Sequence, residues 1–265
     1  MRALADLPLG EIARQLVLEL LPAIVLDPAI RFLFLLVLGL VAFQYLRVGH
    51  LERSLYGLEL TPIWQRVTTA IACGVVGGLL GGLVMVVLGV TLEPDDVRWL
   101  WPVALVLALI QPRYLCFAYA TGLLSLSWLL LGWPQVHIPG LVAPVGVLHL
   151  AEGALVYLDG AEGATPVLAR NGRGEVVGAY LPQRFWPVPA AILVLLALPD
   201  AANQGGIQMP GWWPLIAPAH PERLLEPQWV AAMFPLVAGL GYTDVALTAW
   251  PVQQARRMAG WLLAY

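Results

Sequence analysis

The chain has 265 residues, of which 60% are hydrophobic and 12% are charged, and its mean hydropathy is +0.78. An ordinary soluble domain has about 25% charged residues. The composition therefore excludes that class and indicates an integral membrane protein. The formal net charge of −3 also leaves no basic patch of the kind that nucleic acid requires, so we expect no nucleic-acid partner.

Residues 1–27 are expected to form an amphipathic N-terminal interfacial helix. Glu11, Gln15 and Glu19 recur every four residues, and apolar side chains occupy the other side. Such a helix lies either along the membrane surface or on the rest of the protein. Because its polar face is acidic and suits anionic lipid poorly, we favour packing on the protein.

Apolar runs of membrane-spanning length recur through residues 28–258. The run Val67–Val90 contains no charged residue and exceeds the roughly 20 residues that a spanning helix needs. Four further windows are nearly as apolar: Ala29–Leu46, Tyr114–Gly132, Gly140–Leu158 and Val230–Leu247. Two shorter ones, Trp99–Ile110 and Trp186–Leu198, are flanked by tryptophan, which prefers the membrane interface. These patterns predict an all-α, multi-pass helical bundle of about six to eight spans.

The arginines are distributed unevenly between the two sides of a bundle with seven spans. One set of loops contains nine: Arg47, Arg53, Arg66, Arg113, Arg170, Arg173, Arg184, Arg256 and Arg257. The opposite set contains five. The positive-inside rule therefore predicts that the richer loops are cytoplasmic and the N-terminus is outside. A single re-entrant segment would invert every loop that follows it.

A small β-hairpin is predicted at about residues 164–181, on the proposed cytoplasmic side. Two extended segments flank Asn171-Gly172, and both of these turn residues tolerate a positive φ. An isolated hairpin is only marginally stable in water, so this one is expected to lean on the bundle or on a partner. The other long loop, 199–228, is rich in proline and glycine and predicts an irregular cap.

The second apolar run contains a stripe of small residues. Its members are Gly74, Gly77, Gly78, Gly81 and Gly82. Glycines at a spacing of four let another helix approach the backbone closely. We favour packing inside the bundle, and a seam between two copies in a homo-oligomer is the alternative.

Sequence motifs for catalysis, cofactors and metals are lacking. The chain has no His-Glu-x-x-His motif, no Gly-x-Ser-x-Gly elbow and no phosphate-binding glycine loop. We therefore expect no enzyme activity, no cofactor and no metal site.

His149 and Glu152 form a candidate buried polar pair in the window Gly140–Leu158. Residues three apart share one face of a helix. An ionisable group at that depth costs about 2.5–3.5 kcal/mol on insertion scales and is a functional candidate. We favour a structural hydrogen-bonded pair. The alternative is a proton or substrate path, which would make the chain a secondary transporter or ion-coupled carrier.

Short sequences spread over most of the chain from about residue 28 resemble the multi-pass membrane region of MinJ-type proteins of Firmicutes. They are Gln111–Gly122, Ala151–Tyr157 leading into Gly163–Val167, Phe185–Pro189 and Trp212–Leu215. The resemblance implies a membrane scaffold that helps position the division or septum machinery, with partners of the DivIVA and MinD type and a C-terminal PDZ domain. No PDZ sequence is present here, and residues 259–265 are expected to begin a further span that is cut off.

Overall fold

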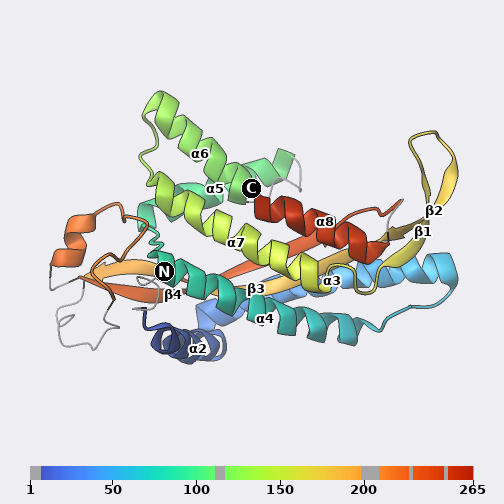
Figure 1. Ribbon diagram of the computed structural model, residues 1–265, viewed down its shortest axis with the longest axis horizontal. Helices are drawn as coiled ribbons and strands as arrows, with labels where there is room; N and C mark the ends of the chain where they lie inside the picture. Colours follow the sequence, from blue (N-terminus) through green and yellow to red (C-terminus); the bar gives the residue numbers. More distant parts are fainter. Residues whose placement is uncertain (1–6, 111–116, 198–208, 227–228, 248–249, 265) are drawn as a thin grey trace. The chain divides into compact units, whose positions relative to one another are not determined.

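The computed structural model describes residues 7–110, 117–197, 209–226, 229–247 and 250–264. It is mostly helical (Figure 1). The helices are α2 (Leu9–Leu26), α3 (Pro28–Tyr56), α4 (Ile63–Leu88), α5 (Pro94–Ile110), α6 (Phe117–Leu131), α7 (Ile138–Asp159), α8 (Pro251–Ala264) and a short 3-10 helix (Pro221–Leu225). The strands are β1 (Thr165–Arg170), β2 (Val176–Leu181), β3 (Gln183–Ala197) and β4 (Trp229–Thr243).

Three of the described helices, α3, α4 and α7, are long and apolar enough to cross a membrane. Much of their apolar surface is uncovered: Phe32 on α3 is 69% exposed and Leu80 on α4 is 56% exposed. Soluble monomers rarely expose large apolar areas, so these helices indicate association with a membrane. A mostly helical chain with helices of membrane-spanning length is thereby confirmed, whereas about six to eight spans are not: α5 and α6 are shorter apolar helices. Residues 114–116 of one expected span lie outside the described residues.

Two expected spans are strands, so the helix predictions for Trp186–Leu198 and Val230–Leu247 are wrong. β3 and β4 pair in a two-stranded sheet. The reason is visible in β3, where Pro187 and Pro189 stand two residues apart. Each proline lacks the N–H that a helix interior requires, and each also disfavours helical dihedrals at the preceding residue. Hydropathy alone does not distinguish such a buried apolar strand from a helix.

Chain contacts divide the protein into two compact units. Unit 1 comprises residues 1–19, 82–148 and 191–234, and unit 2 comprises 20–81, 149–190 and 235–265. Several elements, among them α4, α7, β3 and β4, contribute residues to both.

Two apolar clusters lie in the part of unit 1 that the structure describes. In the first, Ile12 of α2 packs with Val86 and Leu193, so the apolar stripe of the N-terminal helix lies on protein. The second gathers Leu124, Val136 and Leu141, and α5 packs on α6 beside it. In the described part of the 199–228 loop, Trp213 packs on the first cluster and donates its indole N–H to the carbonyl of Val86 at 3.0 Å. Residues 199–208 and 227–228 of that loop lie outside the described residues.

Unit 2 has one larger core. It includes Tyr45 of α3, Val156 of α7 and the fully buried Trp186 of β3, together with Ala255 and Ala259 of α8. Residues 259–264, expected to begin a further span, therefore belong to α8, which starts at Pro251. Tyr265 lies outside the described residues.

The β1–β2 hairpin of unit 2 confirms the predicted hairpin at 164–181. Its antiparallel register runs from Thr165 opposite Leu181 to Arg170 opposite Val176. The loop differs from a two-residue Asn-Gly turn: it spans residues 171–175, and the positive φ of +80° falls on Gly174. The Asn171 side chain closes this loop, because its Oδ1 accepts hydrogen bonds from the backbone N–H groups of Arg173 and Glu175.

Candidate functional site

Unit 2 buries two carboxylates at the ends of its apolar helices. Glu52 lies near the C-terminus of α3 and is 0% exposed, and Asp159 is the last residue of α7 and is 8% exposed. A buried carboxylate is tolerated only when cations and hydrogen-bond donors replace its water. The partners of these two carboxylates therefore show which segments of unit 2 are joined to the C-terminal ends of α3 and α7.

Glu52 joins three segments of the chain. Its Oε1 accepts from Arg66 Nη2 at 2.5 Å and from Thr165 Oγ1 at 2.9 Å, and its Oε2 accepts from the Leu60 N–H at 3.0 Å. Arg66 also donates from Nε to the Thr61 carbonyl at 3.2 Å. The start of α4, the loop 57–62 and the first residue of β1 are thus fixed to the end of α3.

Asp159 joins α7 to β3. Arg184 donates to it through Nε at 2.8 Å and Nη2 at 2.5 Å, and Trp186 donates its indole N–H at 2.7 Å. The two-pronged guanidinium contact is the geometry in which arginine binds carboxylates best. It is needed here because a carboxylate at a helix C-terminus opposes the helix dipole.

Tyr45 of α3 holds the beginning of β3 by a different means. Its hydroxyl donates to the carbonyl of Phe185 at 3.0 Å and accepts from the N–H of the same residue at 3.1 Å. The two rings also meet edge to face, with centroids 5.9 Å apart. One side chain thereby satisfies both backbone groups of a strand residue.

The hairpin is docked at its base and exposed at its tip. At the base, Thr165 binds Glu52, the Tyr56 hydroxyl donates to the Pro166 carbonyl, and Tyr180 exchanges two backbone hydrogen bonds of 3.0 and 2.8 Å with Ala246. Toward the tip, Leu168 is 79% exposed. Such an arrangement presents the tip in a defined direction.

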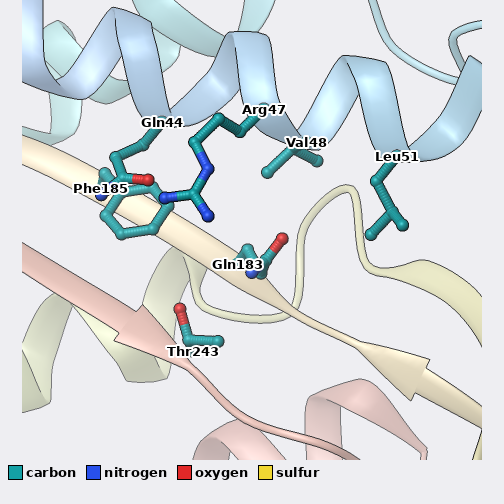
Figure 2. A pocket seen from close by; sticks show the side chains of 7 residues that line it. All are labelled: Gln44, Arg47, Val48, Leu51, Gln183, Phe185 and Thr243. Atoms are coloured by element: carbon teal, nitrogen blue, oxygen red, sulfur yellow. The ribbon is translucent and has the colours of Figure 1, made fainter.

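A pocket of about 420 Å³ lies beside this end of α3, also within unit 2 (Figure 2). Its lining includes Gln44, Arg47 and Val48 of α3, Gln183 and Phe185 of β3, and Thr243, the last residue of β4. No carboxylate of the described residues lines it. The pocket therefore combines one cation with neutral polar and apolar side chains.

The predicted polar pair lies elsewhere in unit 2. His149 and Glu152 are both half-buried on α7, one turn apart, and neither lines the pocket. The structure thus places the two residues on one face of α7, as their spacing requires, and away from the pocket lining.

Most of the glycine stripe of α4 lies against the strand β3 instead of the expected helix, and Gly77 lies against the helix α7. In unit 2, a Cβ on Gly74 or Gly78 would overlap the carbonyl oxygens of Pro187 and Pro189 of β3, and one on Gly77 would meet Leu155 of α7 at 3.0 Å. Gly81 is buried as well. In unit 1, a Cβ on Gly82 would lie 2.9 Å from the Ala191 nitrogen.

Alternate residues of β3 point their backbone N–H and C=O groups to the same edge of the strand. Each of these groups needs a hydrogen-bond partner where no further strand is present. At that edge Phe185 is satisfied by Tyr45, and Leu193 donates to Val90 and accepts from Leu92. Between these two residues, Pro187 and Pro189 lie closest to α4, and proline has no N–H that needs a hydrogen-bond acceptor. The close contact of α4 with β3 therefore requires glycine on the helix, which has no Cβ, and is helped by proline on the strand.

Sequence reasoning missed the buried ion pairs. Arg66 and Arg184 were used only to predict the orientation of the spans, and Glu52 and Asp159 were not singled out. A usable signal existed, since Asp159 ends the apolar helix α7 and Glu52 lies in the last turns of α3. Their partners, however, stand 14 and 25 residues away.

Among the described residues, no group of three or more His, Cys, Asp or Glu side chains is arranged to hold a metal ion. Comparison of the chain with models of protein families, with curated proteins and with solved structures finds no match. The residues of the site therefore carry the functional argument.

Proposed function

We propose that this chain is a membrane scaffold or adaptor that holds partner proteins at the bacterial cell membrane and helps to position the division or septum machinery, as in the Min system. The observation that supports this best is the anchored hairpin. Its base is bonded to the end of α3 and to the segment after β4, whereas its tip is exposed. Buried ion pairs that fix one orientation contribute more to specificity than to stability in some proteins.

The hairpin offers partners two kinds of contact. A two-stranded sheet has open edges, to which an extended peptide can add as a further strand. Near the tip, Leu168 and Val176 are exposed apolar side chains, 79% and 62% exposed respectively, with Arg170 and Arg173 beside them. The division partners, of the DivIVA and MinD type, come from the sequence resemblance.

The test compares the wild-type chain with Leu168→Ser/Val176→Ser. Fluorescent fusions report localisation in a rod-shaped host, and co-purification reports binding of DivIVA- and MinD-type proteins. We expect septal or polar enrichment of the wild type, and at least tenfold less bound partner for the hairpin variant at equal membrane content. Leu58→Ser, at another exposed leucine between α3 and α4, is the matched control and should bind normally. Uniform membrane distribution with no partner bound would refute the scaffold.

A second candidate, a secondary transporter or ion-coupled carrier, is favoured by one observation. His149 and Glu152 are ionisable residues half-buried on α7, one of the membrane-length helices. Proton uptake into proteoliposomes is the readout. The scaffold predicts that His149→Gln and Glu152→Gln leave localisation and partner binding intact. Loss of a proton-coupled activity in Glu152→Gln, with normal expression, would make the carrier the better proposal.

A further inference from the structure

Arg47 lies on α3 at the C-terminal end of the apolar part of this helix. The apolar run Ala29–Leu46 ends at the residue before it. At 1.5 Å per residue this run is about 27 Å long, close to the roughly 30 Å of hydrocarbon in a bilayer. Phe43 and Leu46, in the preceding turn, are 57% and 47% exposed, as lipid-facing side chains would be. A bilayer spanned by this run would place the guanidinium of Arg47 at the level of the lipid headgroups.

Arg47 differs from three neighbouring arginines of unit 2, Arg53, Arg66 and Arg184, in having no acid. Arg53 pairs with Glu59 at 2.8 Å, and Arg66 and Arg184 pair with the buried carboxylates described above. Arg47 makes no ion pair with any residue that the structure describes. Its charge is thus available to an anion from outside the chain.

The pocket beside Arg47 supplies further donors. Figure 2 shows the Arg47 side chain reaching from α3 toward β3, with the side chain of Gln44 next to it and those of Gln183 and Thr243 across the pocket. The carboxamides and the hydroxyl can all donate hydrogen bonds, and Val48 and Phe185 provide apolar wall. Phosphate oxygens only accept, and arginine binds them in a two-pronged manner.

We infer that this pocket binds the phosphate of an anionic phospholipid headgroup, with Arg47 as its charged ligand and Gln44, Gln183 and Thr243 as hydrogen-bond donors. The depth on α3 selects a lipid over a soluble phosphate, because the pocket adjoins the lipid-facing end of a membrane-length helix. Basic pockets beside spanning helices bind anionic headgroups in this way. The inference does not depend on the proposed scaffold function.

The experiment titrates the purified full chain in a neutral detergent with short-chain phosphatidylglycerol, and follows binding by thermophoresis. Short-chain phosphatidylcholine and inorganic phosphate are the comparison probes. We expect phosphatidylglycerol to bind at least tenfold more tightly than either. Arg47→Gln should weaken it tenfold or more and Arg47→Lys by less, since lysine keeps the charge without the planar fork.

Arg173→Gln is the matched control, because it removes the same charge from the hairpin loop, outside the pocket, and should bind as the wild type does. If Arg47→Gln does not fold, Thr243→Val, at an exposed position, tests the same pocket with an expected loss of a few-fold. Equal weakening by Arg173→Gln would mean diffuse attraction and would overturn the pocket. Inorganic phosphate binding as tightly as phosphatidylglycerol would overturn the lipid assignment.

Discussion

Unit 1 and unit 2 both bury carboxylates, and they stabilise them by different means. In unit 2, Glu52 and Asp159 each accept hydrogen bonds from an arginine. In unit 1, Asp96 is 2% exposed and accepts from the backbone N–H of His137 at 2.8 Å. Its second oxygen is buried without a hydrogen-bond partner among the described residues.

The lack of a cation affects the titration of Asp96 in unit 1. Burial raises the pKa of Asp96, against the opposing effect of the backbone N–H groups of His137 and Glu93. This carboxylate is thus shifted toward its neutral form. The comparison teaches that the two units tolerate different substitutions at their buried acids.

Removing one arginine from unit 2 should have the largest effect. Arg66→Met leaves Glu52 charged and buried, so we expect the free energy of unfolding to fall by about 3–5 kcal/mol. Denaturant unfolding in detergent micelles measures it. Arg53→Met breaks an exposed pair and should change stability by less than about 1 kcal/mol. The double variant Glu52→Met/Arg66→Met should recover much of the loss, and equal effects at Arg53 and Arg66 would contradict the account.

The glycine contact gives an intermediate effect that also differs between the units. Gly78→Ala in unit 2 places a methyl group on the backbone carbonyl of Pro189, which cannot move aside, and should destabilise by about 1–3 kcal/mol. The methyl group added by Gly82→Ala in unit 1 would lie 2.9 Å from the Ala191 nitrogen and 3.2 Å from the end of the Leu16 side chain. This variant should therefore lose less stability than Gly78→Ala.

Gly39→Ala is the control for both, since nothing lies within 4 Å of its added methyl group. A helical glycine replaced by alanine in open space should gain about 0.5–1 kcal/mol. Melting temperatures that fall equally for all three variants would show that the stripe is not a packing contact.

The pH dependence of unit 1 should be the smallest effect. Because the pKa of Asp96 is raised in the folded state, the folded chain binds its proton more tightly than the unfolded chain. Its contribution to stability is therefore fully present below the usual aspartate pKa of about 3.9 and is lost as the pH rises through the raised value. Asp96→Asn should remove this component from thermal melts recorded between about pH 4 and pH 7. If the melting temperature of the variant depended on pH as that of the wild type does, Asp96 would not contribute to the pH dependence of stability.

Much of the fold could be predicted from local sequence. The long apolar runs predict α3, α4 and α7, because the bilayer sets the length and composition of a spanning helix. Asn171, followed by two glycines within the loop, predicts the hairpin, because turn chemistry depends on adjacent residues. The candidate pair His149 and Glu152 also follows from spacing, and its role stays a prediction.

The rest depended on segments far apart in the chain. Apolar composition fits a buried strand as well as a helix. Pro187 and Pro189 disfavour a helix in β3 locally, but the pairing of β3 with β4 and the contact of its prolines with α4 depend on packing. Which arginine meets Glu52 or Asp159 is decided by where the helix ends and the hairpin meet. Sequence alone determined the membrane-length helices through local hydropathy, while tertiary structure decided the partners of every buried charge, because Coulomb energy and desolvation depend on distance in space and not on distance along the chain.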